Sequence, residues 1–133
     1  MSFSKYNKIF GIFCGIIAFI IYSLTVEPTA SYWDCAEYIS TSAKLQIGHP
    51  PGAPLFQMLG AIFSILAFNN EQIAYTINMM SVTSSAFTIV FLFWSISLIV
   101  KKILGIGNSI KKNEIIKVFG SSLIGALTFT FTD

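Results

Sequence analysis

Three long uncharged runs dominate the pattern of apolar and polar positions along the chain. They cover residues 9–26, 73–100 and 115–131, and a single charge, Lys117, lies near the start of the third run. A helix of about 18 residues is about 27 Å long, which is enough to cross a hydrocarbon core. A lysine near a helix end can extend its charge to the membrane surface. The pattern therefore predicts an all-α integral membrane protein with three transmembrane helices.

The first run also has the features of a signal peptide, because Lys5 and Lys8 precede it. Cleavage after Ala30 would place Pro28 three residues from the cut, where a small residue is preferred. We therefore expect residues 9–26 to remain as an uncleaved membrane anchor.

A shorter apolar stretch, residues 53–68, falls just under the usual length of a span. Lysines are enriched in cytoplasmic loops. If residues 53–68 do not cross the membrane, six lysines share the side of the N-terminus, namely Lys5, Lys8, Lys101, Lys102, Lys111 and Lys112. We therefore expect a cytoplasmic N-terminus, an external segment over residues 27–72 and a cytoplasmic loop over 101–114. Residues 53–68 then form an apolar helix that lies at the outer surface and starts near Pro54.

The polar loop over residues 27–52 connects the first span to this surface helix. Ser31 can cap a helix, Gly48 lies near the expected end of that helix, and Pro50 prevents its continuation. The loop is therefore predicted to contain a short external helix over residues 31–46.

Small and hydroxyl residues form a stripe along one face of the second and of the third span. Such stripes let helices approach closely and form hydrogen bonds with neighbours, and one remaining span offers too little surface for both. The stripes consist of Asn78, Ser81, Ser85 and Thr88, and of Ser121, Gly125, Thr128 and Thr132. Either the protein oligomerises or these residues begin a longer chain, and we expect the longer chain.

Composition supports a membrane protein and excludes other classes. Charged residues make up 11% and apolar residues 54% of the 133 residues, whereas a soluble globular chain carries roughly 25% charged residues. The eight basic residues are all lysine and the net charge is only +2, which argues against a nucleic-acid-binding protein. Cys14 lies in an apolar run and Cys35 in a polar stretch, so no disulfide framework or zinc site is predicted.

The external loop contains the residues that could perform chemistry. Asp34 and Glu37 are three residues apart on the predicted helix and share a face, which Tyr38 continues. They lie beside Tyr32 and Trp33, whose side chains favour a membrane interface. A carboxylate at this position can meet a water-soluble substrate on one side and a lipid-borne one on the other. Asp34 and Glu37 are therefore the catalytic candidates, with Tyr38 and Trp33 as substrate-binding candidates.

A purely structural role also explains these acids. Ser31 and Asp34 have the spacing of a capping box, and acids in a first helical turn interact favourably with the helix dipole. Glu37 could simply be a solvated surface residue. The spacing alone leaves both interpretations open.

His49 and Lys44 complete the set of substrate-binding candidates. His49, the only histidine, is held extended by the proline that follows it, and it could serve only to form a rigid turn. Without a cysteine or a second histidine nearby it is a weak metal ligand, so no metal ligands are predicted. Lys44, the single external cation, could pair with a phosphate or stabilise the end of its helix.

Two sequence motifs carry a family resemblance. The stretches TVEPTASYWDCAEY, residues 25–38, and GHPPGAPLF, residues 48–56, precede an apolar surface helix and a long span. This order resembles the start of protein O-mannosyltransferases and their glycosyltransferase-C relatives. It is more similar still to one branch of large multi-span membrane proteins, long described as a domain of unknown function, which has a eukaryotic O-mannosyltransferase member. The resemblance covers essentially the whole chain, and the members of that branch are far longer.

The resemblance implies transfer of a mannose-like sugar from a polyprenyl-phosphate donor to a hydroxyl of an acceptor protein. The acceptor residue would be serine or threonine, and the reaction would occur at the outer face of a bacterial inner membrane or its equivalent. Asp34 matches the acid that acts as base or positions the acceptor in the relatives. Their two acids are adjacent, whereas Glu37 is separated from Asp34 here, so the role of Glu37 stays open. His49 matches their histidine-proline-proline motif, which we interpret as shaping the groove.

The fold expected from this resemblance is the N-terminal part of a glycosyltransferase-C-like fold. Its partners would be membrane lipid, the lipid-linked donor, the acceptor protein and the remainder of its own chain, with no nucleic acid. The chain contains no arginine, so we expect the remainder of the chain or a divalent metal to neutralise the departing phosphate. Residues 1–133 alone should then be inactive. Two alternatives stay open, a non-enzymatic membrane subunit and a small oligomeric transporter.

Overall fold

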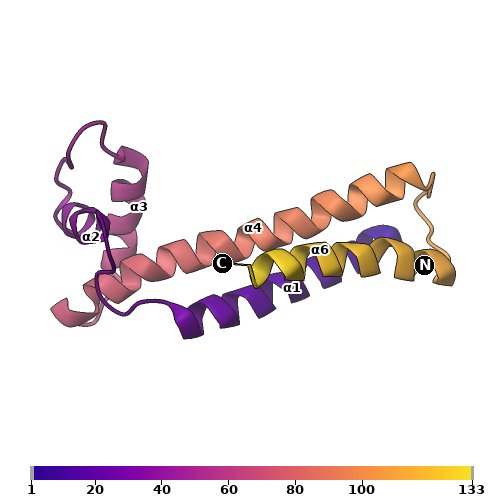
Figure 1. The fold of residues 1–133 in the computed structure, drawn as a ribbon, viewed down its shortest axis with the longest axis horizontal. Helices are drawn as coiled ribbons and strands as arrows, with labels where there is room; N and C mark the ends of the chain where they lie inside the picture. The colour runs from indigo at the N-terminus through magenta and orange to yellow at the C-terminus, as the bar shows by residue number, and fades with distance from the viewer. Residues whose placement is uncertain (1, 133) are drawn as a thin grey trace. The chain divides into compact units, whose positions relative to one another are not determined.

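The computed structural model describes residues 2–132, and within them the regular structure is helical apart from one isolated bridge between Ser2 and Ser109. Helix α1 covers Phe3–Thr25, and helix α4 covers Ile73–Ile103 after a short 3-10 turn, η1, at Asn70–Gln72 (Figure 1). Both α1 and the continuous helix Asn70–Ile103 are long and apolar enough to cross a membrane. The prediction of an all-helical chain is confirmed, and two of the three predicted spans meet this criterion.

The third apolar run is helical but not regular. It consists of α5 at Lys112–Ile115, the π-helical turn η2 at Ile116–Gly120 and α6 at Ser121–Thr130. The hydroxyl of Ser121 donates to the carbonyl oxygens of Lys117 and Val118, at 2.7 and 3.0 Å. Such bonds compete with the regular backbone ladder. Among the described residues, the helices that meet the spanning criterion are α1 and Asn70–Ile103. A third membrane span over residues 115–131 therefore stays a prediction.

The chain divides into two compact units, residues 1–21 with 85–133 and residues 22–84. We call the first the packing unit and the second the site unit.

In the packing unit, α1, the later part of α4 and α6 run alongside one another (Figure 1). A methyl group at Gly11 on α1 would lie 2.1 Å from the indole nitrogen of Trp94 on α4, and one at Gly125 on α6 would lie 2.8 Å from Ile96. These glycines therefore allow the close helix contact for which small residues are selected.

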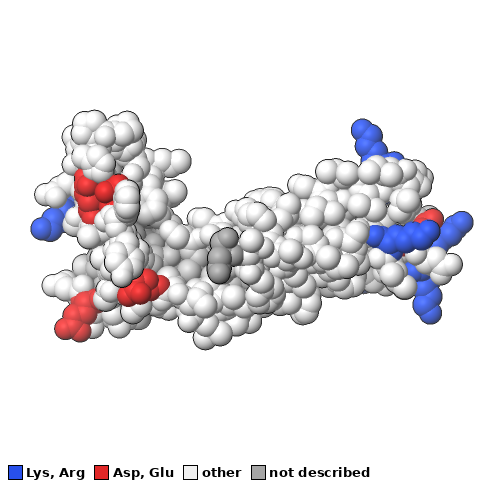
Figure 2. Space-filling model, viewed as in Figure 1, with Lys and Arg blue, Asp and Glu red and all other residues white. Residues whose placement is uncertain are grey.

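Aromatic rings fill the core of the packing unit, where Phe119 stacks on Phe3 and Phe93 at 5.5 and 6.3 Å between ring centroids. The Trp94 indole donates to the carbonyl of Asn7 at 3.0 Å, and the Ser97 hydroxyl donates to the Asn7 side-chain oxygen at 2.6 Å. The lysines of this unit gather at one end of its helices, and the rest of the visible face of these helices is uncharged (Figure 2). This charge pattern is typical of helices that cross a membrane.

The site unit contains α2 at Cys35–Lys44, α3 at Pro54–Ser64, η1 and the beginning of α4. Pro54 occupies the first turn of α3, as predicted. Helix α2 is shorter than expected, and the prediction that Ser31 caps it is wrong. The chain turns at Trp33, which has a positive φ of 67°, so Asp34 becomes the N-cap residue.

Two contacts hold the site unit together. Helices α2 and α3 cross closely where a methyl group at Gly60 would lie 2.7 Å from the Ser42 hydroxyl oxygen. The Asn78 amide on α4 donates to the carbonyls of Glu27 and Thr29, at 2.8 and 2.9 Å. The segment that leads from α1 to α2 is therefore bound to α4 at Thr29, five residues before Asp34.

Candidate functional site

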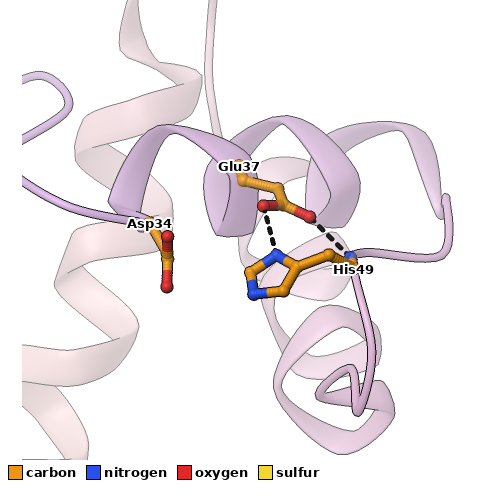
Figure 3. Close-up of side chains that lie close together, drawn as sticks. All are labelled: Asp34, Glu37 and His49. Carbon is orange, nitrogen blue, oxygen red and sulfur yellow. Dashed lines mark hydrogen bonds and ion pairs between the residues drawn. The ribbon is translucent and has the colours of Figure 1, made fainter.

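Asp34, Glu37 and His49 form an acid–histidine cluster in the site unit (Figure 3). One ligand-type atom of each side chain lies within 4.8 Å of the others. Asp34 precedes the first turn of α2, Glu37 lies in that turn, and His49 comes from the loop between α2 and α3. The spacing of three residues brings the two acids to the same side, as the sequence predicts, while the loop brings the histidine back to them.

Glu37 binds His49 at two points. One carboxylate oxygen accepts the backbone N–H of His49 at 2.7 Å, and the other lies 2.6 Å from the ring Nδ1 (Figure 3). A carboxylate only accepts hydrogen bonds, so Nδ1 carries the proton of this bond and Nε2 is left for other partners. A methyl group at Gly48 would lie 3.1 Å from the Glu37 oxygen, so glycine at this position lets the loop approach the carboxylate.

This contact changes the acidity of both groups. The backbone N–H of His49, then its ring N–H, lower the pKa of Glu37 from the usual value of 4.5. The hydrogen bond to Glu37, followed by the negative charges of Glu37 and Asp34, raises the pKa of His49 above 6.5. The pair therefore favours a carboxylate beside an imidazolium, and the imidazolium can present a positively charged Nε2–H.

Asp34 differs from Glu37 in its hydrogen bonding. As the N-cap residue of α2 it makes no side-chain capping hydrogen bond, so the capping interpretation of this acid is not realised. Its carboxylate lies near the imidazole of His49 (Figure 3). A carboxylate that is not used for capping can accept a proton from a substrate hydroxyl, provided the substrate lies within hydrogen-bonding distance.

A hydrogen-bond chain links Glu37 on α2 to α3. The Gln57 amide donates to the Thr41 hydroxyl at 3.2 Å, and that hydroxyl donates to the Glu37 carbonyl at 2.7 Å. Tyr38 packs edge-on against Phe56 of α3, with 5.3 Å between ring centroids. The helix that presents the acids is thus fixed by one polar and one aromatic contact.

A small cleft adjoins the cluster. Glu37, Tyr38, His49, Ala53 and Gln57 belong to its wall, and its volume is about 10 Å³. This space is close to the lower limit for a single water molecule. A larger substrate would therefore contact the cluster from its open side, where 54% of the His49 side chain is exposed.

Asp34 and His49, with Glu37 behind the imidazole, also have the chemistry of a divalent-metal site, which the sequence did not predict. Carboxylates and imidazole are common ligands of zinc and manganese. Because Nδ1 of His49 is hydrogen-bonded to Glu37, Nε2 is the ring atom left to bind a metal, and Glu37 would orient the ring from behind.

The remaining predicted site residues differ in whether they line the cleft. Tyr38 lines the cleft, whereas neither Lys44, in the last turn of α2, nor Trp33, 93% exposed, belongs to its wall. A substrate-binding role for Lys44 and Trp33 stays a prediction. Sequence reasoning missed the contribution of Gln57, although Gln57 and Gly60 form a polar and small stripe on an otherwise apolar helix. The stripe marks the side of α3 that contacts α2.

Comparison with known proteins gives a consistent family assignment. Residues 34–133 match the family described as "Protein O-mannosyl-transferase TMEM260 N-terminal domain". The chain is 36% identical over 90 residues to "Protein O-mannosyl-transferase tmem260" of Dictyostelium discoideum, covering 64% of this chain and 11% of that protein. It is 28% identical over 85 residues to "Protein O-mannosyl-transferase TMEM260" of Mus musculus, covering 64% of this chain and 12% of that protein.

The chain thus spans only 11% and 12% of the length of these two relatives. No solved structure gives a significant match.

Proposed function

The chain belongs to the protein O-mannosyl-transferase TMEM260 N-terminal domain family, and from this premise we propose that it is the N-terminal part of a membrane glycosyltransferase. The full-length enzyme transfers a mannose-like sugar from a polyprenyl-phosphate donor to a serine or threonine hydroxyl of an acceptor protein. The observation that carries the proposal is the acid–histidine cluster, in which Asp34 makes no capping bond and Glu37 holds His49.

In the proposed reaction Asp34 acts as the base. The acceptor oxygen attacks the anomeric carbon of the sugar from the side opposite the phosphate, and its proton passes to the Asp34 carboxylate. The new carbon–oxygen bond forms as the bond to the phosphate oxygen breaks, and the bonding electron pair leaves with the polyprenyl phosphate. Such a transfer requires alignment of the two oxygens and a base near the proton.

His49 interacts with the departing phosphate. Its imidazolium donates the Nε2–H to a phosphate oxygen, where negative charge develops, and transfer of that proton balances the one taken up by Asp34. Glu37 is then a positioning residue, because both of its carboxylate oxygens contact His49. This assignment accounts for the separation of the two acids in the sequence, since only Asp34 contacts the substrate.

The site unit needs a further cation for this chemistry. Besides His49 it contains one cation, Lys44, and four acids, namely Glu27, Asp34, Glu37 and Glu71. We expect the downstream part of the full-length enzyme, or a divalent metal, to supply the missing positive charge. The downstream part also completes a glycosyltransferase-C-like fold.

The proposed topology places the acid–histidine cluster at the outer membrane face. Helices α1 and α4 and the helical run over residues 112–130 cross the bilayer, with the N-terminus in the cytoplasm. The support is the charge distribution, because seven of the eight lysines belong to the packing unit and one to the site unit. The positive-inside rule then orients the chain.

The test is the Asp34→Asn variant of the full-length protein, which keeps the shape of the side chain and removes the base. We expect the rate of sugar transfer to fall by roughly 10²–10⁴-fold, with membrane insertion and thermal stability unchanged. The matched control is Glu71→Gln, an exposed acid in the same unit at the 3-10 turn η1, which should leave transfer unchanged.

Full transfer activity in Asp34→Asn would contradict the proposed role of Asp34. Absence of transfer in the unmodified full-length protein, with binding of a protein partner that Asp34→Asn does not weaken, would favour the non-enzymatic subunit instead.

A further inference from the structure

Helix α1 exposes one face along most of its length. Its buried side contains Gly11 and Gly15, where methyl groups would meet Trp94 and Val90 of α4. Four isoleucines on the opposite side are each more than half exposed, namely Ile9, Ile12, Ile16 and Ile20. Their spacing of three or four residues places them along one face of the helix. Within residues 2–132, α1 therefore presents an apolar surface that the other helices leave uncovered.

Two lysines continue this face toward the N-terminus. Lys5 lies four residues before Ile9 and Lys8 four residues before Ile12, and both lysines are exposed. Residues four apart are neighbours on a helix surface. One side of α1 thus carries two positive charges in its first turns and apolar carbon in the turns that follow.

The beginning of α1 is held in a defined position. The backbone N–H of Phe3 donates to the carbonyl of Asn108 at 3.1 Å, and the buried Phe3 ring stacks on Phe119. The ammonium group of Lys101, near the end of α4, lies 4.5 Å from the centre of the Phe3 ring. The lysines of α1 and α4 therefore belong to one ordered end of the packing unit (Figure 2).

Little negative charge in the packing unit balances these lysines. Its acids are Glu114 and Asp133, against Lys5, Lys8, Lys101, Lys102, Lys111, Lys112 and Lys117. Glu114 uses its carboxylate to accept the backbone N–H of Lys111 at 2.8 Å. Within residues 2–132 none of these lysines forms an ion pair with an acid. The basic end therefore attracts an anionic partner.

The length of the apolar face identifies the kind of partner. From Ile9 to Ile20 the helix rises about 16 Å at about 1.5 Å per residue, which is about half of a hydrocarbon core of about 30 Å. An acyl chain against this face would therefore reach from the lysines to the middle of a bilayer. An acidic protein segment or inorganic phosphate would match the lysines but not the apolar face. A neighbouring apolar helix would match the face but not the lysines.

We infer that Lys5 and Lys8 bind the phosphate of an anionic phospholipid whose acyl chain lies along the exposed isoleucines of α1. The other lysines of this end attract such lipids to the same leaflet, because basic residues beside a span favour anionic headgroups. The inference goes beyond the proposed function and does not depend on sugar transfer. It requires that α1 crosses the bilayer, which its length and apolar composition allow.

Spin-labelled lipids measure this preference without sugar transfer. The full-length protein is reconstituted in phosphatidylcholine, and electron paramagnetic resonance gives the share of a spin-labelled phospholipid that is immobilised at the protein surface. Phosphatidylglycerol should associate about fivefold more strongly than phosphatidylcholine, because one lysine near an anionic headgroup contributes about that factor. High salt should reduce this preference, since it screens the charges.

Paired substitutions locate the binding site on α1. The double variant Lys5→Gln and Lys8→Gln should lower the preference to about twofold or less, whereas Lys5→Arg and Lys8→Arg should retain it because the charge remains. The matched control is the double variant Lys111→Gln and Lys112→Gln. It removes the same charge at the start of α5, where the buried residues Val118 and Phe119 follow within two turns, so most of the preference should remain.

The outcomes separate this inference from the proposed function. Equal losses in the two glutamine variants would show diffuse attraction by the whole basic end and would overturn the site on α1. Equal association of the two lipids with the unmodified protein would also overturn it and leave the transferase intact. A preference that depends on Lys5 and Lys8, in a protein without transfer activity, would support the lipid site and contradict the proposed function.

Discussion

The two units of this chain are built on different principles. The packing unit joins long helices through glycines, such as Gly11 against Trp94, and through stacked aromatic rings. The site unit joins short helices and loops through single polar contacts between segments far apart in the sequence, such as Asn78 with Glu27. The first arrangement distributes stability over many contacts, whereas the second fixes the position of a few side chains. Substitutions should therefore change activity and stability separately in the two units.

After Asp34→Asn, the largest expected effect concerns Glu37, which fixes His49 without contributing much to stability. Glu37→Ala removes both hydrogen bonds to His49, so the imidazole loses its orientation and its nearby negative charge. We expect sugar transfer by the full-length protein to fall by about a hundredfold, while the thermal midpoint changes little because both side chains are exposed. Full activity in this variant would show that His49 does not need Glu37, and Glu71→Ala serves as the control.

The next prediction compares the stability and the transfer activity of two variants, with one glycine replaced in each unit. Gly11→Ala and Gly60→Ala both place a methyl group within 3 Å of a neighbouring side chain, and each should destabilise the protein by about 1–3 kcal/mol. Transfer per folded molecule should fall only for Gly60→Ala, because α2 carries the acids and must shift away from α3. Thermal unfolding and activity corrected for the folded fraction measure the two quantities.

A third glycine serves as the control for this pair. A methyl group at Gly120 would meet nothing closer than 4.0 Å, so Gly120→Ala should leave stability unchanged or raise it slightly. Equal losses of activity per folded molecule in Gly11→Ala and Gly60→Ala would contradict the division of roles between the units.

Much of the fold follows from the sequence because apolar periodicity and length determine it. The run over residues 73–100 lies within α4, the run over 9–26 lies within α1 except for its last residue, and Pro54 marks the start of α3. The positions of helix ends were less predictable. Helix α2 ends at Lys44 because Leu45 adopts a left-handed conformation, with a φ of 49°, and no glycine or asparagine announces this turn.

The acid–histidine cluster could be predicted only in part. The spacing of Asp34 and Glu37 places both acids on one side of a helix, which is a local property of the chain. The contact between Glu37 and His49 spans twelve residues and depends on how the loop returns to α2. Neither periodicity nor spacing contains this information, so the contact between Glu37 and His49 could not be predicted.

A smaller effect is expected where a single side chain ties two segments of the site unit. Asn78→Ala removes the bonds to the Glu27 and Thr29 carbonyls, which should cost about 1–2 kcal/mol and increase hydrogen exchange before α2. Transfer should fall several-fold, because Asp34 follows this segment. Ser97→Ala removes one hydrogen bond to Asn7 in the packing unit and should lower stability with no change in transfer, so equal effects on transfer would contradict the comparison.

The smallest expected effect is the pH dependence of the Glu37–His49 pair. The folded-state pKa of Glu37 is lowered, so its stabilising contribution is complete above the usual value of 4.5 and is lost as the pH falls through the lowered pKa. The folded-state pKa of His49 is raised, so its contribution is complete below 6.5 and is lost as the pH rises through the raised pKa. Both contributions are complete together only between about 4.5 and 6.5.

Thermal unfolding of the full-length protein across this range measures the effect against Glu37→Gln, which cannot form the ion pair. The difference in midpoint between the two proteins should be greatest between pH 4.5 and 6.5 and should shrink on either side. It should be small throughout, because solvent screens an exposed pair. The alkaline limb of sugar transfer should also move to lower pH in Glu37→Gln, since His49 then loses its proton earlier. Parallel stability curves together with an unmoved alkaline limb would show that the pair does not control the charge of His49.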